Sequence, residues 1–152
     1  RASGVIVNVS SIAGRVAPPY SGAYAASKHA LEALTESLHF EVSHLGIRVH
    51  LIQPGRFLTN FHDSIVFPSV WKGSLHEDRA LAFRESLTSL DGADTPADPQ
   101  TVADAIARAA TDHSAPFRTL VGADAELIDA TKSAMSFEDF ETTMRTALDW
   151  HD

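Results

Sequence analysis

A serine, a tyrosine and a lysine stand near the start of the chain at a spacing that suits proton transfer. Ser11 ends the run Asn8-Val-Ser-Ser11, and Tyr24-Ala-Ala-Ser-Lys28 follows it, with Tyr24 thirteen residues after Ser11. A free tyrosine has a pKa of about 10 and is a poor acid–base group at neutral pH. A nearby ammonium favours the phenolate and lowers that pKa. If the serine hydroxyl holds a substrate oxygen, the tyrosine can transfer a proton to or from that oxygen while a hydride is transferred to or from the adjacent carbon.

Three segments must bring these side chains together. Residues 5–9 are a β-branched run that predicts a strand buried on both faces of a parallel sheet, and residues 47–52 predict the next strand. Between them, residues 23–45 predict a helix that ends at Gly46. The helix puts Tyr24 and Lys28 one turn apart. A strand, helix and strand with tight connections predict a right-handed parallel crossover.

The same crossover predicts where a ligand binds. In open α/β sheets, ligands bind at the carboxyl ends of the strands. Ser11 follows the first strand, and the Pro54-Gly55 turn follows the second. We therefore expect Ser11, Tyr24 and Lys28 to face one cleft at this edge. They do not resemble a hydrolase site, because Ser11 lacks the G-x-S-x-G pattern.

The long helix has two apolar stripes. The stripe expected to pack on the sheet is made of Leu31, Leu34, Leu38, Val42 and Leu45. The other stripe has mostly small side chains, namely Ala26, Ala30, Ala33, Ser37 and Phe40. Small side chains allow a second helix to approach closely. We therefore expect a homodimer or homotetramer that forms through the helix at residues 23–45.

The rest of the chain is less sharply patterned. Residues 56–90 contain many large apolar side chains, which fit equally a loop that plugs a core and a lid over an apolar substrate. A helix is predicted at residues 81–90, and another begins with Asp98 as N-cap and Pro99 in its first turn. Residues 117–121 predict a third strand. The remainder predicts helix, with a capping box at Ser136 and Asp139 and with Phe137, Phe140, Met144 and Leu148 in the core.

Composition excludes several classes of protein. The chain has 152 residues, a hydrophobic content of 44% and a net charge of -8, which suits one globular domain and disfavours nucleic acid as a partner. It has no cysteine, which excludes disulfides and thiolate metal sites and fits a cytoplasmic protein. No apolar run reaches the roughly 18 residues of a membrane span. The histidines are not spaced as a metal-ligand set, so no metal site is predicted.

Three motifs together identify a family. The segments Asn8-Val-Ser-Ser-Ile-Ala-Gly14, Tyr24-Ala-Ala-Ser-Lys28 and Gly46-Ile-Arg-Val-His-Leu-Ile-Gln-Pro-Gly55 resemble the short-chain dehydrogenase/reductase family over residues 5–59. The resemblance implies a Rossmann-type α/β fold with a doubly wound parallel sheet. Because the family places its catalytic tyrosine thirteen residues after its serine, it assigns the serine role to Ser11 rather than Ser10. It assigns the acid–base role to Tyr24, and to Lys28 both the lowering of the Tyr24 pKa and a bond to the nicotinamide ribose.

The resemblance also implies a cofactor, NAD or NADP. The family's P-G-x-x-x-T segment lines the nicotinamide and reads here as Pro54-Gly-Arg-Phe-Leu-Thr59. This adds Pro54, Gly55, Phe57 and Thr59 to Tyr24 and Lys28 as expected cofactor-binding residues. Phe57 departs from the family, which often has a branched aliphatic residue there. The expected activity is hydride transfer between NAD(P)(H) and a small alcohol or carbonyl substrate, with an apolar substrate favoured.

The family's glycine-rich dinucleotide turn has no counterpart here. The eight glycines are scattered from Gly4 to Gly122. We therefore expect the chain to be the C-terminal part of one Rossmann-type domain, without the N-terminal half. We also expect this part to have little activity by itself. The expected divisions are a catalytic strand–helix–strand unit over residues 1–55, a substrate lid over 56–94, and a last helix, strand and tail over 95–152. Two alternatives remain open: a non-catalytic dinucleotide-binding or scaffolding protein, and a sugar-nucleotide epimerase of the same superfamily.

Overall fold

A three-stranded parallel sheet forms the centre of the molecule. The computed structural model describes residues 3–57, 59–61, 64, 69–89 and 97–150. Strands β1 (Gly4–Val9), β2 (Ile47–Pro54) and β3 (Arg118–Val121) are ordered β1-β2-β3. Val5 pairs with Arg48, and Leu51 pairs with Arg118. The predicted parallel crossover and the third strand are confirmed.

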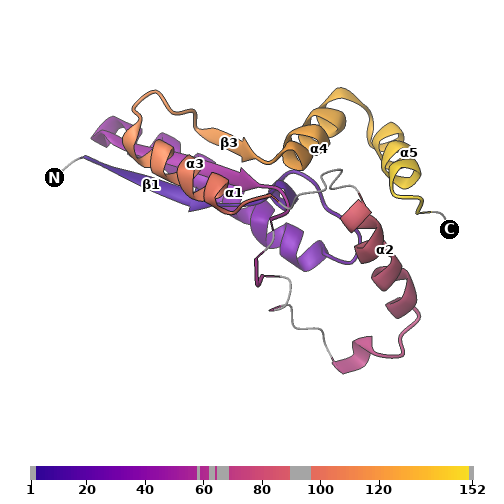
Figure 1. Ribbon diagram of the computed structural model, residues 1–152. Helices are drawn as coiled ribbons and strands as arrows, with labels where there is room; N and C mark the ends of the chain where they lie inside the picture. Colours follow the sequence, from indigo (N-terminus) through magenta and orange to yellow (C-terminus); the bar gives the residue numbers. More distant parts are fainter. Residues whose placement is uncertain (1–2, 58, 62–63, 65–68, 90–96, 151–152) are drawn as a thin grey trace.

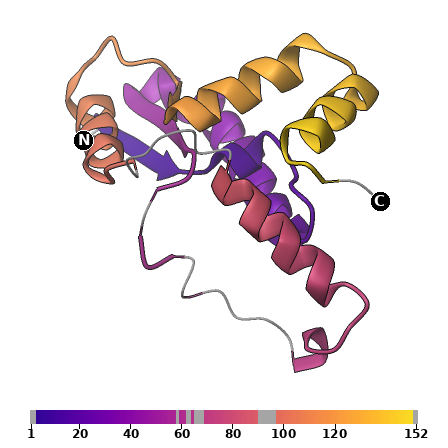
Figure 2. The same ribbon diagram turned by 45° about the vertical axis from the view of Figure 1, so that its right-hand side comes forward.

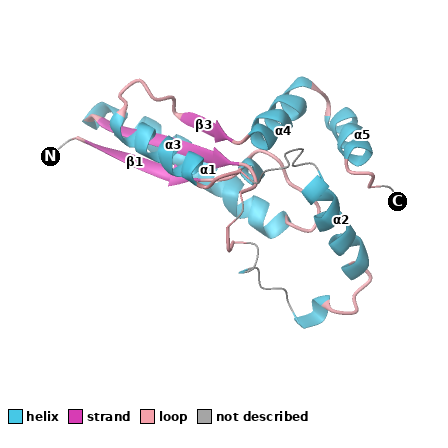
Figure 3. Cartoon of the chain, viewed as in Figure 1, coloured by secondary structure: helices cyan, strands magenta, loops and turns pink. Residues whose placement is uncertain are grey.

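Helices cover both faces of this sheet. Helix α1 (Gly22–Val42) lies behind the strands and α3 (Gln100–Thr111) in front of them (Figures 1 and 3). A short 3-10 turn, η2 (Ser43–Leu45), extends α1 to Gly46, whose φ of 72° makes it the left-handed cap that the sequence predicts. The α/β class with helices on both faces is therefore confirmed. Of the described residues, no helix is long and apolar enough to cross a membrane.

The remaining elements gather where the strands end. The arrows of all three strands point toward α2 (Glu77–Ser89), α4 (Ala123–Ala134) and α5 (Phe137–Ala147), and Figure 2 shows α2 extending away from the sheet. The described residues also form the 3-10 turns η1 (Ile12–Gly14) and η4 (Ser69–Trp71). Part of the predicted lid, residues 58, 62–63, 65–68 and 90–94, lies outside the described residues.

Two apolar clusters hold these layers together. Ile52, Ala109 and Val121 join α3 to the sheet, and Phe57 packs against them. Ile12 and Ala125 belong to a second cluster, which joins η1 to α4. Burial of such side chains is the main favourable term in folding. The second cluster places the segment that follows Ser11 directly against α4.

The sheet-facing side of α1 differs from the prediction. Its buried residues are Ala25, Glu32 and Thr35, whereas Leu34 is 69% exposed. The reason is a pair of long-range polar contacts. Asn8 donates its amide N–H to Thr35 Oγ1 at 2.9 Å, and Arg118 Nε lies 3.2 Å from Glu32 Oε2. Hydrogen-bonded polar groups can replace apolar ones at a buried face. The predicted leucine stripe is therefore only partly buried: Leu31, Leu38 and Val42 are half-buried, whereas Leu34 and Leu45 are exposed.

Arg118 ties β3 to this polar face. It also pairs with Glu36, one turn along α1. Burial alone would lower the pKa of the Arg118 guanidinium, but the hydrogen bonds and charges of Glu36 and Glu32 outweigh burial and raise that pKa above its usual value. The ion pairs with Glu32 and Glu36 therefore fix α1 against β3.

Other sequence predictions are confirmed with shifted limits. Asp98 Oδ1 accepts from Gln100 N at 2.9 Å, so Asp98 caps α3 although the helix begins one residue later than expected. Ser136 Oγ accepts from Asp139 N at 3.1 Å as the predicted cap of α5. Phe137, in the first turn of α5, is 69% exposed rather than buried, whereas Phe140 packs against the cluster that contains Ile12 and Ala125. Strand β1 has no fully buried residue, because its outer edge is not paired by the described residues.

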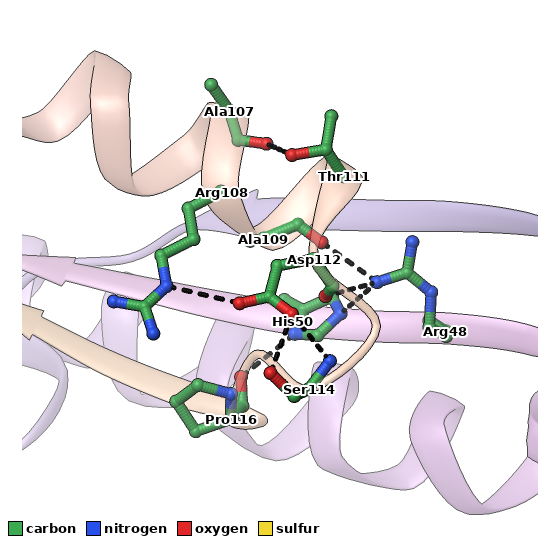
Figure 4. A network of polar contacts seen from close by, with 9 residues as sticks. All are labelled: Arg48, His50, Ala107, Arg108, Ala109, Thr111, Asp112, Ser114 and Pro116. Carbon is green, nitrogen blue, oxygen red and sulfur yellow. Dashed lines mark hydrogen bonds and ion pairs between the residues drawn. The ribbon is translucent and has the colours of Figure 1, made fainter.

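A network of polar contacts closes the opposite end of the sheet (Figure 4). Arg48, on β2, donates to the backbone oxygens of Ala109 and Asp112 at 3.1 and 3.0 Å. It also donates to Ala110 O at 2.9 Å. The carbonyls of Ala109 and Ala110 lie in the last turn of α3, where a helix leaves them without partners in the helix itself. The Asp112 carbonyl, at the C-cap, also accepts from Ala115 N at 3.2 Å. His50 Nδ1 lies 2.9 Å from Pro116 O. Hydrogen bonds from the Ser114 hydroxyl and backbone N–H hold the pKa of Asp112 below its ordinary value.

Replacing Gly14 by alanine tests the packing of η1 on α1. A Cβ at Gly14 would lie 2.8 Å from Ser10 Oγ and 2.9 Å from Glu32 Cγ. Overpacking of this kind costs roughly 1–3 kcal/mol, and we expect Gly14→Ala to lower the free energy of unfolding by about that amount in urea denaturation. Gly22→Ala is the control, because a Cβ at Gly22 meets nothing within 4 Å. Equal stabilities of the two variants would show that Gly14 is not packed as described.

Candidate active site

Ser11 lies at the carboxyl end of β1, against the end of β2. Its side chain caps η1 by accepting from Ala13 N at 3.1 Å, and its Oγ lies 3.5 Å from Pro54 O. Ser10 is placed differently. Its backbone N donates to Ile52 O at 2.8 Å, and its buried hydroxyl lies beside Gly14 with no hydrogen-bond partner among the described residues. The structure therefore brings Ser11, and not Ser10, to the Pro54 turn.

Tyr24 and Lys28 lie in the first turns of α1, beside the end of β1. The Lys28 ammonium donates to Val9 O at 3.1 Å and lies 5.7 Å from the centroid of the Tyr24 ring. The Tyr24 ring also lies beside the Phe61 ring, at a centroid distance of 5.6 Å. Tyr24 and Lys28 are close because residues four apart lie one turn from each other on the same face of a helix. The contact of Lys28 with Val9 directs the pair toward the strand end.

The turn after β2 carries the residues that the resemblance assigns to the nicotinamide. Gly55 N donates to Val121 O at 2.8 Å, so the turn is fastened to β3. Thr59 is exposed, and its hydroxyl accepts from Phe61 N at 3.3 Å. The Phe57 ring packs against the cluster of Ile52, Ala109 and Val121. The cofactor contacts of Pro54, Gly55, Phe57 and Thr59 remain predictions.

The three chemical side chains share one edge of the sheet, but they are not joined to one another. Among the described residues, no hydrogen bond links the Tyr24 hydroxyl to Ser11 or Lys28. Two hollows were also found elsewhere. One of about 360 Å³, lined by Gly4, Arg48 and His113 among others, lies at the amino ends of the strands. One of about 350 Å³ lies between η1 and α4, beside Arg15 and Asp129. Neither is lined by Ser11, Tyr24 or Lys28.

Sequence reasoning missed the side chain that fastens the turn. Asp124, in the first turn of α4, accepts from Arg56 N at 2.7 Å. The Arg56 guanidinium in turn donates to Leu87 O of α2. The two residues of the Asp124–Arg56 bond are 68 positions apart, and their contact depends on the meeting of the ends of β2 and β3. Neither a hydrophobic periodicity nor a short sequence motif predicts such a contact.

Fold and site together define a class of protein. A parallel sheet with helices on both faces and polar side chains at its carboxyl edge is the architecture of doubly wound, nucleotide-binding α/β proteins. The model of the short chain dehydrogenase family matches residues 1–66. The chain belongs to the short-chain dehydrogenase/reductase family, as the motifs indicated.

Individual relatives agree with this placement. A 3-ketodihydrosphingosine reductase of Bacteroides thetaiotaomicron is 38% identical over 120 residues, which are 78% of this chain and 44% of the relative. A short-chain dehydrogenase of Streptomyces avermitilis superposes with a TM-score of 0.60 at 29% identity, over 96% of this chain and 53% of that one. One of Burkholderia phymatum, solved with NAD, has a TM-score of 0.64 at 27% identity, over 93% and 49%. The chain thus spans about half the length of these relatives.

Proposed function

We propose that the protein is an NAD(P)-dependent oxidoreductase that interconverts an alcohol and a carbonyl compound. The observation that carries the proposal is the meeting of separate elements at the carboxyl edge of the sheet. Ser11 contacts Pro54 at the end of β2, and Lys28, with Tyr24 beside it, contacts Val9 at the end of β1. A hydroxyl, a phenol and an ammonium gathered at a strand end suit proton transfer to a substrate oxygen.

Each of the three residues has a distinct role in this proposal. Tyr24 is the general acid or base that gives a proton to the carbonyl oxygen or removes it from the alcohol. Ser11 holds that oxygen by a hydrogen bond, for which its hydroxyl is already fixed at the end of β1. Lys28 supplies a positive charge within 5.7 Å of the Tyr24 ring, which favours the phenolate that forms when the proton leaves.

The donor set fits a nicotinamide cofactor. An ammonium has three N–H groups, and Lys28 gives one to Val9 O, which leaves donors for the hydroxyls of a ribose. Pro54, Gly55 and Thr59 would border the nicotinamide, and Phe57 would support the turn from the core side. When bound, NAD or NADP would supply or accept the hydride. The Burkholderia phymatum relative, whose structure contains NAD, supports this assignment.

A small, apolar alcohol or ketone suits the surroundings of Tyr24. The Phe61 ring lies against the Tyr24 ring and is half-exposed, so apolar surface adjoins the reacting hydroxyl. The name of the Bacteroides relative, a 3-ketodihydrosphingosine reductase, agrees with a ketone substrate. The test is the consumption of NADH and NADPH with a panel of apolar and polar ketones. Steady consumption of the cofactor that increases with the apolarity of the ketone supports the proposal. The absence of cofactor consumption with every carbonyl compound tested contradicts it.

The chain supplies the catalytic half of the domain in this proposal. Because Ser10 N bonds to β2, the alternate residues Val5, Val7 and Val9 direct their backbone groups to the other edge of β1. That edge is available for a further strand, and a glycine-rich dinucleotide turn would come from residues outside these 152. A cytoplasmic location stays a prediction. Cofactor affinity should be far weaker for residues 1–152 alone than for a protein that also contains such a segment.

Assembly through α1 is part of the same proposal. The small-residue stripe that the sequence indicates is exposed along its whole length, and Phe40 in it is 72% exposed. An arginine in the middle of such a stripe prevents close helix approach. We therefore expect Ala30→Arg to reduce the molecular mass in solution measured by light scattering, from a dimer or tetramer to a smaller species. Ala103→Arg, at an exposed position of α3, is the control. An unchanged mass in Ala30→Arg would exclude this interface.

A further inference from the structure

Asp124 lies where the ends of β2 and β3 meet the start of α4. Its Oδ2 accepts from Arg56 N at 2.7 Å, directly after the Pro54-Gly55 turn. The same turn is held by one backbone bond, from Gly55 N to Val121 O at 2.8 Å. A carboxylate that accepts from a backbone N–H makes a stronger bond than a neutral acceptor does. Two bonds from the β3–α4 side therefore fix the position of the turn.

Glycines make room for this carboxylate. A Cβ at Gly55 would lie 2.1 Å from Asp124 Oδ1 and 2.3 Å from Oδ2, distances that no real structure tolerates. A Cβ at Gly122 would lie 2.6 Å from Oδ1, and Gly122 has a φ of 106° that other residues rarely adopt. The Asp124 carboxylate thus occupies the space of two absent side chains. Its contact with the turn is close packing as well as a hydrogen bond.

The turn that Asp124 holds contacts Ser11 and leads into the residues assigned to the nicotinamide. Pro54 O is the acceptor beside the Ser11 hydroxyl. Phe57 and Thr59, which the family resemblance assigns to the nicotinamide, follow directly after Arg56. The Arg56 side chain reaches Leu87 O at the end of α2. A change in the backbone at Arg56 would therefore reach Ser11, the nicotinamide side and α2 together.

We propose that Asp124 is a positioning residue of the active site: its carboxylate sets the Pro54–Arg56 turn and through it the binding of the nicotinamide cofactor. This inference rests on the proposed function, because it assumes that the turn borders a cofactor. Asp124 touches neither substrate nor cofactor in this role. It acts through the Arg56 N–H and the backbone of Gly55.

The kinetic test uses Asp124→Ala and Asp124→Asn in the full protein that contains this chain. Alanine removes the acceptor, and we expect the KM for NAD(P)H to rise about tenfold, as for the loss of one charge-assisted hydrogen bond. Asparagine keeps an acceptor oxygen without the charge, and a rise of only about threefold is expected. Asp129→Asn is the matched control, since Asp129 lies on the same helix and pairs with Arg15 at 2.8 Å, away from the turn.

The outcomes separate this inference from the proposed function. A merely structural role would reduce the amount of folded protein, which lowers the apparent kcat and leaves the KM unchanged. An unchanged KM in Asp124→Ala, in an enzyme that consumes NAD(P)H, overturns the positioning role alone. A wild-type protein without any NAD(P)H turnover overturns the proposed function, and the positioning role falls with it. A raised KM in Asp124→Ala with partial rescue by asparagine supports both.

A second test does not depend on turnover. Gly55→Ala should lower the Tm of the wild-type protein by about 4 °C or more, because the new methyl group meets the carboxylate. In the Asp124→Ala background, the same change should lower the Tm by less than about half as much, because the obstacle is gone. Gly122→Ala should stay harmful in both backgrounds, because its φ of 106° remains unfavourable. Equal effects of Gly55→Ala in the two backgrounds would overturn the contact.

Discussion

Phenylalanine in place of Tyr24 is expected to lower turnover by between about a hundredfold and ten-thousandfold, the usual contribution of a general acid or base. The phenyl ring keeps the contact with Phe61 and the proximity to the Lys28 ammonium, which lies 5.7 Å from the ring centroid. Only the hydroxyl is lost, so the fold and the binding of the cofactor should be retained. The measurements are steady-state turnover and NAD(P)H binding followed by fluorescence.

The chain offers a matched control for this change. Tyr20 is the other tyrosine, and its ring contacts Trp71, His76 and Phe83 at centroid distances of 6.2–6.3 Å. Because these contacts use the ring rather than the hydroxyl, Tyr20→Phe should leave turnover close to that of the wild type. Turnover retained in Tyr24→Phe, or lost equally in both variants, would refute the role of Tyr24.

Methionine in place of Arg48 is expected to cause the largest loss of stability, about 3 kcal/mol, as for breaking a network that pairs a partly buried charge. The guanidinium donates to three carbonyls at the C-terminal end of α3, those of Ala109 and Asp112, which Figure 4 shows, and that of Ala110. Methionine preserves the length of the side chain but donates nothing. The free energy of unfolding from urea denaturation measures the loss.

Arg108→Met is the control for Arg48. Arg108 lies on α3 itself, has a side chain that is 71% exposed, and pairs with Asp112 four residues away at 3.4 Å. Exposed ion pairs contribute little to stability. The loss of unfolding free energy in Arg108→Met should therefore be a small fraction of the loss in Arg48→Met. Equal losses in the two variants would mean that the network in Figure 4 does not hold α3 to the sheet.

The crossover could be predicted from sequence because its signals are local. The β-branched run before Ser11, the helical spacing of Tyr24 and Lys28 and the glycine at position 46 all lie within one element or its end. Local signals of this kind agree with the final fold in most natural proteins. For the same reason the edge of the sheet that carries Ser11 and Pro54 followed from strand order alone.

The orientation of α1 could not be predicted in that way. Its buried face depends on Glu32, whose partner Arg118 is 86 residues away, and on Thr35, whose partner Asn8 is 27 residues away. These contacts outweigh a leucine stripe that the local pattern favours. The anchoring of the turn by Asp124 was missed for the same physical reason. Contacts between residues that are far apart in the sequence produce no periodic pattern from which they could be predicted.

The transfer of a labelled hydride tests the central proposal most directly. NAD(P)H with both hydrogens at the nicotinamide C4 position replaced by deuterium would be incubated with an apolar ketone and the full protein that contains this chain, and the product analysed by mass spectrometry. We expect an alcohol that is heavier by one deuterium at the former carbonyl carbon, and its formation should nearly cease in Tyr24→Phe. An unlabelled product, or no alcohol from the wild-type protein, would contradict the assignment of Ser11, Tyr24 and Lys28 as the catalytic residues of an oxidoreductase.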